Sequence, residues 1–293
     1  MILVSDQRLT DVKTGRPVTD RANKAVADLR SPQAAFAYTG IAEVAGKPTD
    51  EWIMETMAEG DNREDSLVRL RDVGTREFAS VPLNRAIKRL AIIGCGWGVM
   101  KSGPGELEPY VALVSNFAGR RSWLPKAEDS FELRWFYPHR DRHGIFRGGP
   151  PVGAWTAGQV FSRSRSERLI RQITRGLART PSVAVSARIV AEAVRDFASS
   201  NTSVGKGLVV ISVPRPVPGQ EGGISSPTPP VAPRGLADHF KAWSSMSGEM
   251  SFLYLPPDLS APPASYGPMV IDEGMQIKGI EMWVGEEPPW WKN

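Results

Sequence analysis

Histidine and cysteine, two side chains that often carry catalysis or bind metals, are scarce in this chain of 293 residues. It has three histidines and a single cysteine, Cys95. One cysteine excludes an intramolecular disulfide and zinc sites built from several cysteines. So few histidines also make a Ser-His-Asp triad a weak candidate. Because Cys95 stands between two glycines in an apolar run, we expect a packed core thiol and not a nucleophile.

Two of the histidines, His139 and His143, flank Asp141 at a spacing that a metal ion could use. Arginines adjoin both histidines and would repel a cation, and a third ligand is not apparent. We therefore expect a solvated loop here, and we predict neither a metal nor a cofactor. A glycine pattern that begins at Gly94 is typical of phosphate loops, but it lacks the rest of the dinucleotide fingerprint.

Positive charge is concentrated in one part of the chain. The formal net charge is +4, but residues 134–179 hold ten arginines against two acidic residues. Four arginines recur at spacings of three and four, which places them on one face of a predicted helix: Arg168, Arg171, Arg175 and Arg179. This face is either a solvated helix surface or a cationic track for phosphates or an acidic protein. Few aromatic residues are interleaved, so stacking of single-stranded bases is not indicated.

Apolar periodicity predicts the elements that must position any site. Strands are expected at 2–10, 34–40, 90–97, 110–116, 131–137, 207–213, 252–255, 267–271 and 277–284. Helices are expected from about residue 49, with Thr49 or Asp50 as its cap, and at 62–71, 166–178 and 185–199. The strands at 90–97, 110–116 and 131–137 suggest a meander.

The order of these elements, with strands and helices in separate blocks, predicts an α+β protein. We expect a main domain over 1–213, a Pro/Gly/Ser-rich linker or loop over 214–234, and a strand-rich extension over 235–293 that adds strands to the main body. No apolar run approaches the ~20 residues that cross a bilayer. The lack of a secretion signal and the single cysteine favour a cytoplasmic protein with no membrane partner.

Several segments together resemble the proteasome β subunits and their bacterial relatives. Residues 4–10, with their Asp-x-Arg pattern, resemble the second strand of that family, and Lys24 falls where the family has its lysine. Residues 37–42 resemble the turn whose glycine, here Gly40, lends its N–H to the oxyanion hole. Residues 202–207 resemble the late Ser-Gly turn that leads into a sheet strand. The resemblance covers roughly residues 2–213.

This resemblance implies a four-layer αββα sandwich of the N-terminal-nucleophile (Ntn) hydrolase type, acting on a peptide or amide substrate. In that superfamily the hydroxyl or thiol of the first residue attacks an amide carbonyl, and the free α-amine serves as base. By resemblance, Lys24 is the activating cation and Asp6 its partner. Gly40 is then the oxyanion donor, and Ser203 is a supporting hydroxyl.

The chain departs from the family at its start. The family carries its nucleophile on a strand that precedes the Asp-x-Arg strand, whereas five residues precede Asp6 here and Met1 is not a nucleophile. Either a longer chain is the active hydrolase, or the protein is a nucleophile-free scaffold or binding module. In the second case its arginine face contacts acidic or nucleic-acid partners. Relatives usually assemble through their helix layers, so a homo-oligomer is a further expectation.

Overall fold

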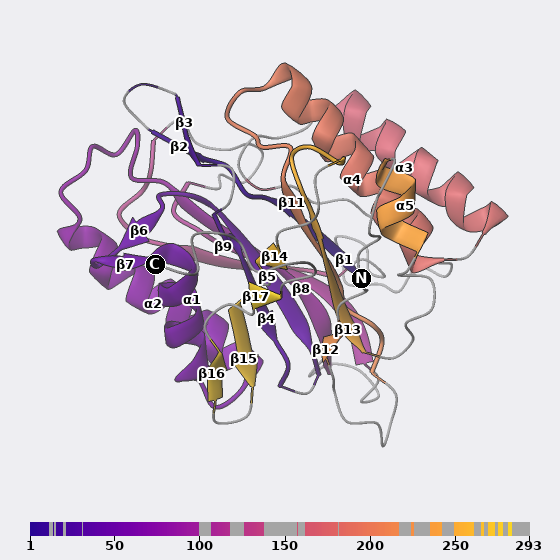
Figure 1. Ribbon diagram of the computed structural model, residues 1–293. Helices are drawn as coiled ribbons and strands as arrows, with labels where there is room; N and C mark the ends of the chain where they lie inside the picture. Colours follow the sequence, from indigo (N-terminus) through magenta and orange to yellow (C-terminus); the bar gives the residue numbers. More distant parts are fainter. Residues whose placement is uncertain are drawn as a thin grey trace, which may run out of the picture.

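The structure is a computed structural model of the whole chain (Figure 1). It describes residues 1–11, 14, 16–19, 22–30, 32–99, 107–117, 126–137, 157, 162–180, 182–216, 224–225, 235–241, 249–260, 265–266, 269–272, 275–277 and 281–282. Within these residues five helices and several β-sheets form a mixed α+β protein. The helices and strands occur largely in separate blocks along the chain, as the sequence predicts.

The larger sheet has seven strands, most of them antiparallel. Its order is β10 (Glu132–Phe136), β9 (Leu107–Ser115), β8 (Leu90–Val99), β5 (Ala34–Gly40), β4 (Ala25–Asp28), β15 (Met269–Asp272) and β16 (Met275–Ile277). The antiparallel neighbours β8, β9 and β10 confirm the predicted meander. The exception to the antiparallel pattern is β15, which runs parallel to β4.

The smaller sheet has four strands, in the order β1 (Ile2–Asp6), β11 (Leu208–Ser212), β13 (Met250–Leu255) and β12 (Ile224–Ser225). Strand β1 is antiparallel to β11 and occupies an edge of this sheet. Three short ribbons complete the strands: β2 (Leu9–Thr10) with β3 (Pro17–Thr19), β6 (Glu43–Val44) with β7 (Lys47–Pro48), and β14 (Ser265–Tyr266) with β17 (Glu281–Met282). Strands β13 and β15 both follow residue 234, so the late part of the chain contributes to both large sheets.

Helices α1 (Thr49–Ala58) and α2 (Arg63–Ser80) pack on the seven-stranded sheet, where Ile53 and Leu70 belong to the same buried cluster as Phe36. Asn62 caps α2 by accepting a hydrogen bond from the Asp65 N–H. The prediction that Thr49 or Asp50 caps α1 is wrong. The helix already begins at Thr49, after Pro48, and the Thr49 hydroxyl donates to the Ile41 carbonyl instead, at 2.9 Å.

The other three helices are α3 (Arg163–Arg179), α4 (Val183–Ser200) and α5 (Leu236–Lys241). Helices α4 and α5 cover the four-stranded sheet, where Ala187 and Phe240 share a buried cluster with Leu208 and Leu253. Helix α3 lies outside α4 and packs on it through an apolar stripe. None of the described helices has both the length and the apolar character needed to traverse a bilayer.

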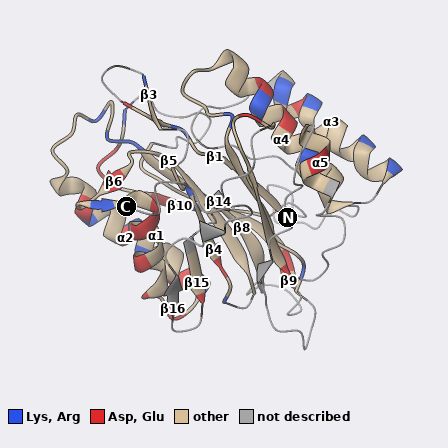
Figure 2. Cartoon of the chain, viewed as in Figure 1, with Lys and Arg blue, Asp and Glu red and all other residues tan. Residues whose placement is uncertain are grey.

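The two large sheets bury an apolar cluster between them. Its side chains are small on the seven-stranded sheet and larger on the four-stranded sheet. Alanines of β4 and β5 lie in the same cluster as Val209, Ile211 and Phe252 of the four-stranded sheet. Cys95 belongs to this cluster, and burial raises the pKa of its thiol to about 11, consistent with a core thiol. Charge differs between the outer helices. Basic residues recur along α3, whereas α1 carries acidic residues and α2 carries both signs of charge (Figure 2).

Candidate functional site

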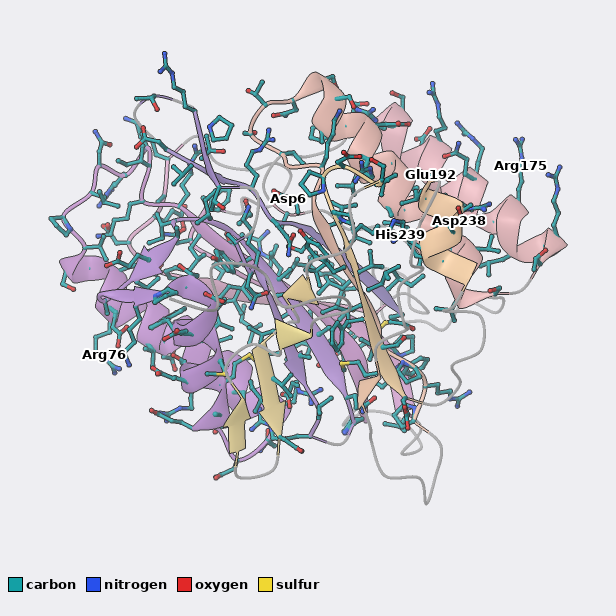
Figure 3. The ribbon with its side chains drawn as sticks, in the orientation of Figure 1. Asp6, Arg76, Arg175, Glu192, Asp238 and His239 are labelled. Carbon is teal, nitrogen blue, oxygen red and sulfur yellow. The ribbon has the colours of Figure 1, made fainter. Side chains whose placement is uncertain are left out.

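Asp6 and Lys24 form an ion pair between the two large sheets. Asp6 is the last residue of β1, and Lys24 immediately precedes β4. The Lys24 ammonium donates to Asp6 Oδ1 at 3.3 Å, and the two side chains are only 9% and 22% exposed. Figure 3 shows Asp6 where the end of β1 approaches the larger sheet. The structure therefore brings together the two side chains that the family resemblance pairs.

The Asp6 carboxylate is fixed by three donors. Besides Lys24, its Oδ1 accepts the backbone N–H of Arg8 at 2.9 Å and that of Gly205 at 3.2 Å. The bond from Arg8 turns the chain after Asp6, so the single strand predicted over 2–10 is wrong and is divided into β1 and β2. The bond from Gly205 ties the turn between α4 and β11 to the same carboxylate.

The Lys24 ammonium has unused hydrogen-bonding capacity. An ammonium carries three N–H donors. In the part of the chain that the structure describes, Asp6 is the one hydrogen-bond partner of Lys24 Nζ. A nearly buried charge with unfilled donors is costly unless another acceptor meets it. The site therefore favours an additional acceptor, such as a hydroxyl, a thiol or an amine, beside Lys24.

Gly40 lies at the end of β5, near the same site. Its φ of +118° disfavours any other residue, and a Cβ there would lie 1.9 Å from the Arg89 carbonyl oxygen. The Tyr38 N–H donates to the Lys24 carbonyl at 3.1 Å. N–H groups of alternate residues point to the same edge of a strand. The Gly40 N–H is therefore directed to the edge of β5 that borders Lys24, just past the start of β4.

Ser203 lies in the turn that contacts Asp6, but its hydroxyl has a different partner. Both its backbone N–H and its Oγ donate to Asn201 Oδ1, at 3.0 and 2.7 Å. The contact between this turn and Asp6 runs through the backbone of Gly205. The structure thus places Ser203 close in the chain to the ion pair, with its hydroxyl committed to Asn201.

Three polar residues that sequence reasoning did not select lie beside this pair. Asn23 Nδ2 donates to Asp50 Oδ2 at 3.1 Å, and the Tyr38 hydroxyl donates to the Asn23 carbonyl at 3.4 Å. Burial raises the pKa of the Asp50 carboxyl. Burial, together with the charges of Asp50 and Asp6, also raises the pKa of Tyr38, which keeps its phenol protonated. Asp50 gave no signal because its place at a helix start is typical of an ordinary acidic first turn.

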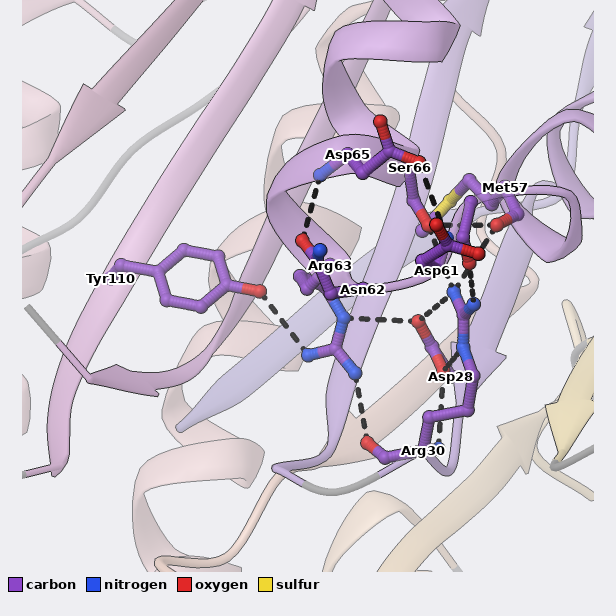
Figure 4. A network of polar contacts seen from close by, with 10 residues as sticks. Asp28, Arg30, Met57, Asp61, Asn62, Arg63, Asp65, Ser66 and Tyr110 are labelled. Carbon is purple, nitrogen blue, oxygen red and sulfur yellow. Dashed lines mark hydrogen bonds and ion pairs between the residues drawn. The ribbon is translucent and has the colours of Figure 1, made fainter.

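A second buried polar cluster lies between β4 and the start of α2 (Figure 4). The fully buried Asp28 carboxylate accepts hydrogen bonds from both Arg30 and Arg63, at 2.9 to 3.0 Å. Arg63 also donates to the Tyr110 hydroxyl at 3.3 Å, and Arg30 donates to the Gly60 carbonyl at 2.9 Å, just past α1. Because these groups satisfy one another, we assign the cluster to stability and not to chemistry.

One of the three histidines lies in the described part of the chain. His139 and His143 lie outside the described residues. Within the described residues, no group of three or more His, Cys, Asp or Glu side chains is arranged to hold a metal ion. His239 of α5 is fully buried, with its Nε2 3.3 Å from the Leu259 carbonyl, and burial lowers its pKa.

No protein-family model matches the chain, and no curated protein matches it in sequence.

Proposed function

We propose that this protein is an amide-bond hydrolase of the N-terminal-nucleophile type, with a four-layer αββα sandwich. The packing of α1 and α2 on one sheet, and of α4 and α5 on the other, supports this arrangement. So does the buried cluster between the two sheets. The observation that carries the proposal is the nearly buried Lys24 ammonium, held by Asp6 at 3.3 Å with donors left for another acceptor.

In the proposed reaction a hydroxyl or thiol stands beside Lys24. The ammonium favours loss of the nucleophile's proton, which passes to the free α-amine of the same residue. The nucleophile then attacks the carbonyl carbon of the amide. The oxyanion accepts the Gly40 N–H, a type of contact worth about 3 kcal/mol to the transition state. As the tetrahedral intermediate collapses, the C–N bond breaks and the leaving amine takes the proton back from the α-ammonium. Water then hydrolyses the acyl-enzyme and restores the hydroxyl or thiol.

The free edge of β1 offers a position for the strand that would carry the nucleophile. Strand β1 is an edge of its sheet, so among the described strands its second edge has no partner. A strand joined to the start of β1 by a hairpin would run antiparallel along that edge. Its own first residue would then lie beside the end of β1, at Asp6 and Lys24. Ordinary strand and hairpin lengths put that residue about 10–15 positions before Ile2.

The N-terminus of the protein isolated from its native source tests the proposal. Mass spectrometry is expected to find a mature chain that begins with Thr, Ser or Cys, about one hairpin upstream of Ile2. A mature chain that begins at Met1 or Ile2 would contradict the hydrolase proposal, because neither residue offers a nucleophile. The ion pair would then be explained as part of a scaffold or binding module.

A further inference from the structure

The outer face of α3 carries a row of unpaired arginines. Arg168, Arg171, Arg175 and Arg179 are all exposed, and in the described part of the chain none of them has a hydrogen bond or an ion pair. Arg175 extends from α3 away from the rest of the molecule (Figure 3). We call these four residues the arginine stripe.

The stripe is straight and faces away from the fold. Successive residues of a helix turn by about 100°, which puts the four arginines within roughly 80° of arc. Leu169 and Ile173, on the opposite side of α3, are buried against α4. At a rise of about 1.5 Å per residue, the stripe spans about 16 Å along the helix axis. A linear ligand along α3 can therefore meet all four guanidinium groups.

This arrangement is unfavourable for the helix by itself. Like charges three and four residues apart repel each other on a helix surface. The first turn of α3 contains no acidic residue, although negative charge is what the helix dipole favours there. A face selected only for solubility would mix both signs of charge. The stripe is better explained by a negatively charged ligand that offsets this repulsion.

The chemistry of the stripe favours phosphate over a protein surface. Protein interfaces depend on buried apolar or aromatic anchors, and α3 exposes none of the large hydrophobic side chains that the described surface shows. Guanidinium groups match phosphate oxygens in a two-point geometry. Helix α3 contains no aromatic residue for stacking on unpaired bases. A protruding helix fits the major groove of B-form DNA, whereas the major groove of A-form RNA is too narrow.

We propose that the arginine stripe binds the phosphate backbone of double-stranded DNA without sequence preference. The stripe belongs to α3, whereas the ion pair of Asp6 and Lys24 lies between β1 and β4, so this proposal is independent of the hydrolytic one. Four neutralised phosphates would give log Kobs a slope of about −3.6 against log salt. Affinity would then fall on the order of 100-fold between 50 and 200 mM salt.

Fluorescence anisotropy with a mixed-sequence DNA duplex tests the proposal on the full chain. The test variant changes all four stripe arginines to glutamine, which keeps good helix propensity. A matched control removes the same charge from exposed positions elsewhere, with Arg16, Lys47, Arg76 and Arg85 changed to glutamine. Circular dichroism and thermal melting establish that both variants are folded.

The proposal expects DNA binding with the stated salt slope, loss of that binding in the stripe variant, and its retention in the control. A single Arg175→Gln change is expected to reduce the slope by about 1. Three results would overturn the proposal: no binding at 50 mM salt, equal weakening in both four-residue variants, or tighter binding to duplex RNA or to polyglutamate than to DNA.

Discussion

Lys24 Nζ lies 3.3 Å from Asp6 Oδ1, although the two residues border different sheets. The contact joins the end of an edge strand to the start of a strand inside the larger sheet. Ion pairs with this little exposure seldom add stability over an apolar pair of the same size. Unlike the Asp28 cluster, whose groups satisfy one another, the Lys24 ammonium has donors left over, which supports the proposed role in hydrolysis.

Asp28→Ala is expected to lower the free energy of unfolding by about 3–5 kcal/mol, because it leaves the Arg30 and Arg63 guanidinium groups without their common carboxylate. Urea denaturation measures the change. Asp72→Ala is the matched control, since Asp72 is 57% exposed and pairs with Arg71 at the surface. We expect that control to cost no more than about 1 kcal/mol. Similar losses in both variants would contradict the structural role of Asp28.

Gly40→Ala is expected to lower the free energy of unfolding by at least about 3 kcal/mol. The new methyl group would meet the Arg89 carbonyl oxygen, and the backbone would also keep a positive φ. Gly46→Ala separates the two causes, because Gly46 has a φ of +79° with no atom within 4 Å of a Cβ. We expect a cost of about 1–2 kcal/mol there. Thermal or chemical denaturation of the two variants should show the larger loss of stability in Gly40→Ala. A larger loss in Gly46→Ala would exclude the close approach of the Arg89 carbonyl to residue 40.

Stability should fall in mild acid because of His239. Burial lowers the pKa of this imidazole, and the charge of Arg195 lowers it further, against the opposing effects of the hydrogen bond to Leu259 and the charge of Asp238. Below the unfolded pKa of about 6.5, the unfolded chain then binds a proton that the folded chain does not. Above that pH, His239 is therefore neutral in both states and does not reduce the free energy of unfolding. It falls as pH decreases, by at most about 1.4 kcal/mol per unit from this group.

Urea denaturation at pH 5, 6, 7 and 8 measures this dependence. The His239→Gln variant keeps a hydrogen-bond donor for the Leu259 carbonyl but does not titrate. We expect its stability to decline less than that of the unchanged protein between pH 7 and 5. Parallel curves for the two proteins would show that His239 keeps an ordinary pKa.

Sequence patterns identify the parts of this fold that depend on local order. Helices α3 and α4 follow from apolar periodicity, because each buries one side of a regular repeat, and the helix expected at 62–71 is the first part of α2. The meander of β8 to β10 follows from apolar runs, since β9 is buried on both faces from Pro109 onward. The helix start near Thr49 is confirmed, but its predicted cap is wrong, because a hydroxyl residue at the start of a helix is typical of a cap. Its hydroxyl bonds to Ile41 instead, eight residues earlier in the chain.

Long-range contacts explain what the sequence could not predict. Nothing near Asp28 indicates that Arg63, 35 residues later, would meet it in the core. The same holds for Asn23 and Asp50, 27 residues apart. The proximity of Asp6 and Lys24, in contrast, was predicted from the family resemblance. Without that resemblance, both residues would be expected to be ordinary surface charges.

The central claim is tested most directly by the rate of amide hydrolysis. This rate is measured for the native protein and for its Lys24→Ala and Lys47→Ala variants. Lys47 is an exposed lysine paired with Glu55, so its change removes the same charge away from the site. If Lys24 activates the nucleophile, Lys24→Ala lowers the rate by a factor on the order of 100 or more while the protein stays folded, and Lys47→Ala leaves it unchanged. Equal rates in the two folded variants, or a native protein without hydrolytic activity, would contradict the account.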